Sequence, residues 1–133
     1  MTWPCIEFTA PVRIESEMNR RDHWAKRKRR FDEQRRTVAY SWPKWTVPTE
    51  PVPWPYRGYG PGPFVVTLTR IGPRKLDSDN LASGFKAARD QIAFTLGIDD
   101  GSERLTWKYE QERGKPREYA IRVRIQPILT PDE

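Results

Sequence analysis

The run FVVTLTRIGPRKLDSDNLASGFKAARDQIAFTLGIDDG, residues 64–101, decides the fold of this chain. Its first part, Phe64–Ile71, is rich in β-branched residues and predicts a well-buried strand that ends at Gly72 and Pro73. An acidic turn follows. A helix is then predicted from about Asn80, because apolar residues recur every three or four positions, at Leu81, Phe85, Ala88, Ile92 and Leu96.

Two other regions show the two-residue period of half-buried strands. Upstream, apolar residues alternate from Ile6 to Ile14, and Pro11 predicts an edge strand or a bulge because proline cannot donate to a sheet ladder. Downstream, residues 105–110 and 119–125 alternate on both sides of a turn containing Gly114 and Pro116. This pattern predicts an antiparallel hairpin with one apolar and one polar face.

The predicted fold is α/β in the α+β sense, a single small domain over residues 1–133. We expect a mixed, mostly antiparallel sheet packed with two helices, since 133 residues suit one hydrophobic core. Residues 41–63 are rich in Trp and Pro and predict a loop insertion, and residues 127–133 predict a loose tail. The aromatic side chains of the loop either pack on the core or stack on exposed bases.

The whole excess of positive charge lies in one segment. Residues 19–36 hold nine basic and three acidic residues, an excess that equals the net charge of +6 of the chain. Trp24, Phe31 and Val38 are seven residues apart and predict a helix that begins near Asn19 or Asp22. Such a run can be a solvated helix face, but contacts to DNA phosphates explain the concentrated charge better. The predicted DNA-binding residues are Arg20, Arg21, Lys26, Arg27, Lys28, Arg29 and Arg30, with Arg74 and Lys75.

Two pairs of aspartates flank the predicted helix. Asp77 and Asp79 precede it, and in extended backbone both side chains point the same way. Asp99 and Asp100 follow it. Hard carboxylate ligands suit Mg²⁺ or Mn²⁺, which keep several waters and also bind phosphate oxygens of a substrate.

The length of the helix is an obstacle to one shared site. A straight helix of this span would be roughly 24 Å long at 1.5 Å per residue, so its two ends cannot meet. They meet only if the helix is broken near Ser83 and Gly84, or if the chain turns back after Gly97. A purely structural role for the aspartates also stays open, because Asp-x-Asp-Asn can cap a helix and Asp-Asp-Gly is a turn signal.

Three motifs in order resemble the RusA family of Holliday-junction resolvases of bacteria and their phages. They are Asp77-x-Asp79-Asn80-Leu81, Lys86-Ala87-Ala88-x-Asp90 and Gly97-Ile98-Asp99-Asp100. The resemblance extends from about Phe64 to the final strand. It implies a homodimer that binds branched DNA and resolves four-way junctions by paired, Mg²⁺-dependent nicks in recombination and repair, with Mn²⁺ as a substitute metal.

The resemblance also implies roles for site residues. Asp77, Asp79 and Asp100 would be the catalytic, metal-binding carboxylates, with Asp99 as a substitute for Asp100. Lys86 would lie near the scissile phosphate and stabilise charge on the phosphoryl oxygens. The chain departs from the family's spacing here, because four residues intervene before Lys86; an ion pair with Asp90 at i+4 is the alternative role for this lysine.

Several other features bound the partners and the compartment. No apolar run approaches the roughly 20 residues that cross a bilayer, so no membrane partner is expected. Cys5 is the single cysteine and cannot form an internal disulfide, which favours a reducing compartment. The resemblance implies that this is the cytoplasm of a bacterium or of a phage-infected host cell. His23, the only histidine, is interpreted as a phosphate contact or a surface residue. A DNA-binding module without catalysis and a nuclease for flaps or forks remain as alternatives.

Overall fold

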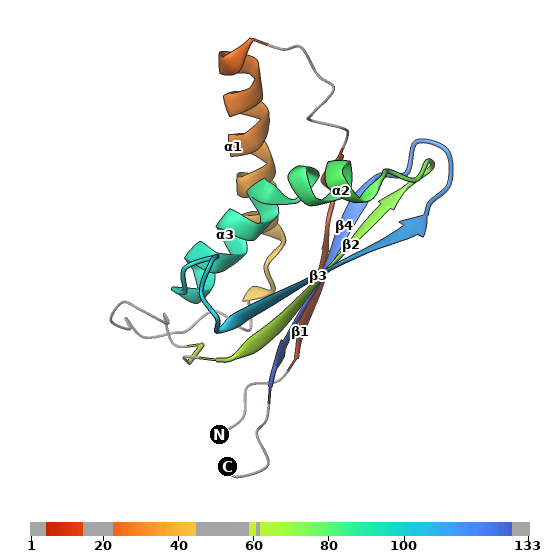
Figure 1. Cartoon of the computed structure of the whole chain (residues 1–133). Helices are drawn as coiled ribbons and strands as arrows, with labels where there is room; N and C mark the ends of the chain where they lie inside the picture. The colour runs from red at the N-terminus through yellow and green to blue at the C-terminus, as the bar shows by residue number, and fades with distance from the viewer. Residues whose placement is uncertain (1–4, 15–22, 45–58, 61, 129–133) are drawn as a thin grey trace.

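In this computed structural model, β2, Phe64–Gly72, lies inside a four-stranded sheet, between β4, Ala120–Pro127, and β3, Leu105–Arg113. β1, Ile6–Ala10, pairs with the other edge of β4, so the order is β1-β4-β2-β3 (Figure 1). The structure describes residues 5–14, 23–44, 59–60 and 62–128. β1–β4 and β2–β4 are antiparallel and β2–β3 is parallel, which confirms the predicted α+β class with a mixed, mostly antiparallel sheet.

The predicted antiparallel hairpin between residues 105 and 125 is wrong. Both segments are strands, but β2 lies between them, with Ile71 opposite Glu112 of β3 on one edge and Ala120 of β4 on the other. In β2 the consecutive residues Leu68, Thr69 and Arg70 are all buried, in keeping with the inner position of this strand in the sheet. An inner position supplies this strand with a hydrogen-bonding partner on each edge.

β1 is the edge strand that Pro11 predicts. It ends at Ala10, directly before the proline. Val12 and Ile14 beyond it are still buried, and the backbone N–H of Val12 donates to the carbonyl of Ala10. The alternation of the sequence therefore continues past the end of the strand.

The three helices lie on one side of the sheet (Figure 1), and their bounds are α1, Trp24–Ser41, α2, Ser78–Gly84, and α3, Lys86–Leu96. α1 packs against α3 and β1. It begins later than the predicted Asn19 or Asp22, because His23 is its N-cap and accepts a hydrogen bond on Nδ1 from the backbone N–H of Ala25 at 3.2 Å. The ring of His23 thus has a structural role at the surface.

The predicted apolar stripe of α1 is only partly used. Val38 is fully buried and Phe31 is half-buried, whereas Trp24 is 65% exposed at the start of the helix. Burial therefore increases toward the C-terminal end of α1, where this helix joins the core.

Phe85 separates α2 from α3, so the described residues form three helices, whereas two were predicted. Its backbone N–H donates to both Leu81 and Ala82, at 3.2 and 3.3 Å, which tightens the last turn of α2. Its ring is fully buried and stacks on Tyr109 of β3, with 5.2 Å between the ring centroids. The interruption falls directly after Gly84, where the sequence predicts a possible break.

Only the ends of the Trp- and Pro-rich segment fall within the described residues. Trp42 and Tyr59 are buried, with ring centroids 5.9 Å apart, and Trp42 also packs on Phe8 at 5.3 Å. These two aromatic side chains extend the core, as the packing alternative predicts. Residues 45–58 and 61 lie outside the described residues.

The predicted tail begins later than expected. Pro127 is the last residue of β4 and pairs with Phe64, and the backbone N–H of Ile128 donates to the carbonyl of Pro63 at 2.8 Å. Residues 129–133 lie outside the described part of the chain. Within the described ranges, no helix has the length and apolar character needed to cross a membrane.

Candidate functional site

Three of the four predicted catalytic residues line one pocket. Asp79 comes from the first turn of α2, Lys86 begins α3, and Asp100 lies in the turn that follows α3. The pocket has a volume of about 500 Å³ and is completed by Ala82, Ser83 and Arg89. We call it the Asp79 pocket. Asp79 and Asp100, one from each aspartate pair, therefore line the same pocket.

Two local features bring Asp100 back to the side of α3. The break at Phe85 divides the helix, so α3 has 11 residues. Gly97 then adopts a left-handed conformation with φ of 74°, and its N–H and that of Ile98 both donate to the carbonyl of Ala93. The side chain of Ile98 is buried and the carbonyl of Asp100 accepts from Arg89, so the chain after α3 folds back beside that helix.

The backbone of Asp100 is held by two side chains. Its carbonyl accepts hydrogen bonds from Trp107 Nε1 at 2.9 Å and from Arg89 Nη2 at 3.3 Å. Arg89 also donates to the hydroxyl of Tyr109 at 2.7 Å, and its guanidinium lies 4.8 Å from the centroid of the Trp107 ring. Sequence reasoning missed Arg89 and Trp107, since neither belongs to an acidic motif; the only signal was that Arg89 directly precedes Asp90.

Asp90 is a further acidic residue next to this site. It is half-buried on α3 and lines a neighbouring pocket together with Asp99 and Asp100. Burial first, and then the charge and hydrogen bonding of Asp100, raise the pKa of Asp90, while Lys86 and Arg35 act in the opposite direction. The carboxylates of Asp90 and Asp100 therefore lie close enough for their charges to interact.

Asp77 and Asp99 both have local structural partners. Asp77 is the N-cap of α2, and its carboxylate accepts hydrogen bonds from the backbone N–H of Asn80 at 2.9 Å and from the side-chain amide of Asn80 at 3.0 Å. Asp99 is exposed and accepts from the backbone N–H of Gly101 at 2.9 Å. Neither side chain lines the Asp79 pocket. The capping and turn roles foreseen for these motifs are therefore present.

Lys86 is exposed and is not paired with Asp90. The ion pairs among the described residues are Lys28–Asp32 at 3.3 Å and Arg122–Glu112 at 2.8 Å. No ion pair within 4.0 Å joins Lys86 to Asp90 among the described residues, although the charge of Lys86 acts to lower the pKa of Asp90, and Lys86 lines the Asp79 pocket.

The carboxylates of the Asp79 pocket suit a divalent cation only if water and substrate complete its coordination. Among the described residues, no group of three or more Asp, Glu, His or Cys side chains is arranged to hold a metal ion. Mg²⁺ is commonly bound by one or two carboxylates and completed by waters and substrate phosphate, and Asp79 and Asp100 supply two carboxylates in one pocket. The residues present fit an open, substrate-completed site and not a closed protein cage.

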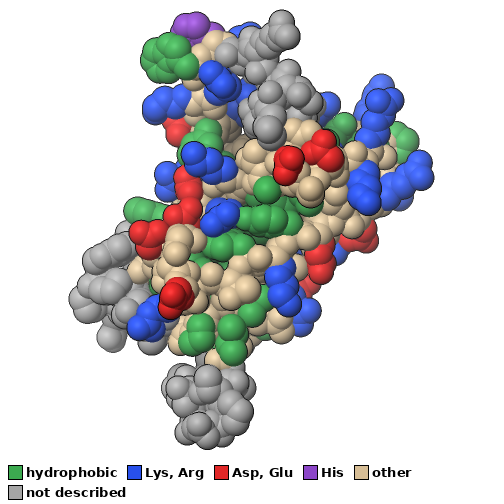
Figure 2. Space-filling model, in the orientation of Figure 1, with side chains coloured by type: hydrophobic (Ala, Val, Ile, Leu, Met, Phe, Trp, Pro, Cys, Tyr) green, Lys and Arg blue, Asp and Glu red, His purple; other side chains and the backbone are tan. Residues whose placement is uncertain are grey.

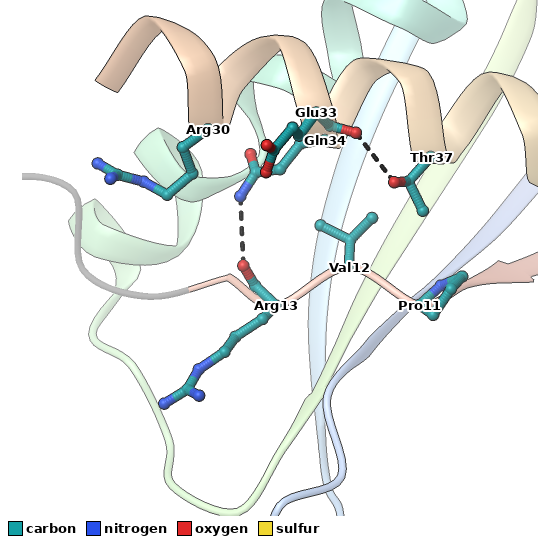
Figure 3. A pocket seen from close by; sticks show the side chains of 7 residues that line it. All are labelled: Pro11, Val12, Arg13, Arg30, Glu33, Gln34 and Thr37. Carbon is teal, nitrogen blue, oxygen red and sulfur yellow. Dashed lines mark hydrogen bonds between the residues drawn. The ribbon is translucent and has the colours of Figure 1, made fainter. Parts of the chain in front are cut away.

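The basic residues predicted on α1 cover its exposed surface. Lys26 to Arg29 are exposed, and Arg30 is half-buried. Gln34 fixes the helix to the chain after β1 by donating to the carbonyl of Arg13 at 3.2 Å, and both Arg13 and Arg30 extend away from Pro11 and Thr37 (Figure 3). Arg20 and Arg21 lie outside the described residues.

Arg74 and Lys75 are exposed in the connection between β2 and α2. Figure 2 shows Lys and Arg side chains over the tip of the sheet where β2 and β3 end, beside acidic side chains over α2. Basic side chains therefore flank the acidic residues of α2 at the tip of the sheet.

No protein-family model matches the sequence, and no curated protein is significantly similar to it.

Proposed function

We propose that this protein is a metal-dependent endodeoxyribonuclease that acts on branched DNA and resolves four-way junctions by paired nicks. The observation that carries the proposal is the Asp79 pocket, which gathers Asp79, Lys86 and Asp100 from three separate parts of the chain. Two carboxylates and one ammonium group in an open pocket are the groups that cleavage of a phosphodiester requires.

The surroundings of the pocket support DNA as the substrate. A polyanion is attracted by the net charge of +6, and exposed basic residues cover α1 and the connection after β2. Such contacts position the phosphate backbone without reading base sequence. Recognition of a branch would then come from the shape of the DNA.

Asp79 and Asp100 would hold Mg²⁺ or Mn²⁺ in this proposal. When bound, the metal would activate a water for in-line attack on the phosphodiester and stabilise the leaving 3′ oxygen. Lys86 would stabilise negative charge on the phosphoryl oxygens. Trp107 and Arg89 hold the main chain of Asp100, so its carboxylate is directed without a contact of their own to the metal.

A homodimer is part of the proposal. Paired nicks across a two-fold junction are most simply made by two identical subunits related by a two-fold axis. Each subunit would contribute one Asp79 pocket.

The proposal is tested with a synthetic four-way junction in Mg²⁺. Asp79→Asn should lower the nicking rate on the order of a hundredfold or more, because it removes the charge of one ligand while keeping its shape. Junction binding in Ca²⁺ should stay close to that of the wild type. Asp32→Asn is the matched control, because Asp32 is an exposed aspartate of α1 that pairs only with Lys28. Equal nicking by Asp79→Asn and Asp32→Asn would contradict the proposal.

A second candidate is a DNA-binding module without catalysis. It is favoured by the hydrogen bonds of Asp77 and Asp99, which show that part of the acidic motif caps and turns the chain. Metal binding separates the two candidates. A nuclease should bind Mn²⁺ saturably and lose this binding in Asp79→Ala, whereas a module should not bind Mn²⁺.

A further inference from the structure

A second pocket lies where β2 and β3 end, and its lining is strongly basic. It has a volume of about 410 Å³, and four of its lining residues are Arg70, Arg74, Lys75 and Arg113. Gly72, Pro73, Gln111 and Glu112 complete it. We call it the basic pocket. It is separate from the Asp79 pocket, with which it shares no residue.

Arg70 is a buried guanidinium without a carboxylate partner in the described part of the chain. Only 4% of its surface is exposed, and its guanidinium donates to two carbonyl oxygens, from Nε to Ile14 at 3.2 Å and from Nη1 to Arg74. Burial lowers the pKa of Arg70, partly offset by Tyr119. A buried charge is costly unless an opposite charge compensates it, so this group favours an anion in the pocket.

The acidic residue of the lining does not supply that anion. The carboxylate of Glu112 forms an ion pair with Arg122 of β4 at 2.8 Å. Four basic lining residues therefore face a single carboxylate that is already engaged. The excess of positive charge in the pocket suits an anionic ligand with more than one acceptor oxygen, such as a phosphate group.

The position of the Arg70 guanidinium depends on Gly72, whose backbone lies against it. A Cβ atom on Gly72 would lie 2.7 to 2.9 Å from the guanidinium atoms of Arg70, closer than atoms in contact can be. A side chain at position 72 would therefore push the guanidinium away from its carbonyl partners. The pair of Gly72 and Arg70 makes this a built pocket and not a chance gathering of surface charge.

The basic pocket is linked by hydrogen bonds to Leu76, which directly precedes Asp77. The side chain of Gln111 receives a hydrogen bond from the backbone N–H of Leu76 at 2.9 Å and donates to the carbonyl of Leu76 at 2.8 Å. Leu76 is followed at once by Asp77 and α2. One side chain of the pocket thus fixes the start of the segment that carries Asp79.

From these contacts we propose that the basic pocket binds a backbone phosphate of DNA, distinct from the phosphate that enters the Asp79 pocket. The identity of the ligand as DNA rests on the proposed function, whereas the preference for a phosphate rests on the buried Arg70 and its basic neighbours. Held at two phosphates, the DNA strand would have its direction across the site fixed.

Arg113→Gln and Arg74→Gln test this proposal, because both side chains are exposed and their loss leaves Arg70 in place. The measurement is junction binding in Ca²⁺ over a series of salt concentrations, with no cleavage required. Each lost phosphate contact should reduce the slope of log K against log salt by about 0.9. Arg113→Lys should restore part of the loss.

Lys108→Gln is the matched control, since Lys108 is an exposed cation of β3 outside the pocket. Equal slopes for Arg113→Gln, Arg74→Gln and Lys108→Gln would overturn the proposal, even if the protein cuts junctions. A reduced slope for the pocket variants alone would support it, even if no junction is cut. Inorganic phosphate is a separate probe: thermal stabilisation by phosphate that Arg113→Gln abolishes, with an unchanged DNA slope, would mean a free-phosphate site and would also overturn it.

Discussion

At the scale of single residues, Asp77 has an observed structural role and a proposed chemical one. Its carboxylate caps α2 through Asn80. Asp77→Ala should lower the free energy of unfolding by about 1 kcal/mol, while Asp77→Asn should lower it by much less, because asparagine is an equally good N-cap. Urea denaturation measures both. If Asp77 also binds metal, both variants should lose Mg²⁺-dependent nicking; nicking that survives in Asp77→Asn would leave the cap as its only role.

Trp107 is the second residue at which a role can be isolated. Trp107→Phe keeps a ring beside Arg89 and removes the N–H that donates to the carbonyl of Asp100. The free energy of unfolding should fall by about 1 kcal/mol, the typical net value of a hydrogen bond. Trp24→Phe is the control, since Trp24 is 65% exposed and the change there should have almost no effect. Equal effects would show that the indole hydrogen bond does not hold Asp100.

At the scale of elements, the site depends on how α3 ends. Gly97 has φ of 74°, which costs an L-residue roughly 1 kcal/mol or more. Gly97→Ala should therefore destabilise the protein by about this amount and displace Asp100 from the Asp79 pocket, with a lower nicking rate. Gly101→Ala is the matched control, because Gly101 has no positive φ and an added Cβ would meet only Asp99 Oδ1 at 3.6 Å. Denaturation and nicking that respond alike to both changes would contradict this account of the turn.

The elements also show what could be predicted from the sequence. The sequence could predict the strand Phe64–Gly72 and a possible break near Gly84, because β-branched residues, apolar spacing and glycine act over a few positions. The position of β2 between β3 and β4 could not be predicted, because alternation of apolar and polar residues predicts a strand but does not say which strand pairs with it. At the site, Asp79 and Asp100 belong to recognisable motifs. Arg89 and Arg70 do not, because their roles arise from contacts across the fold.

At the scale of the whole molecule, paired nicking requires two sites. The chain has a mass of 15.7 kDa, so sedimentation equilibrium should give about 31 kDa for the proposed homodimer. If the measured mass is that of one chain at the concentrations that cut junctions, the proposed homodimer is wrong. Single nicks by a monomer would then fit a flap or fork nuclease better than a resolvase.

The most direct test of the central claim is the reaction of the wild-type protein with three labelled DNAs in Mg²⁺. These are a four-way junction, a fork and a linear duplex of matched sequence. We predict paired nicks in the junction, slower cutting of the fork and little cutting of the duplex, with all cutting stopped by chelation of the metal. No cutting of any DNA in either Mg²⁺ or Mn²⁺, or equal cutting of junction and duplex, would contradict the claim that the Asp79 pocket is a nuclease site for branched DNA.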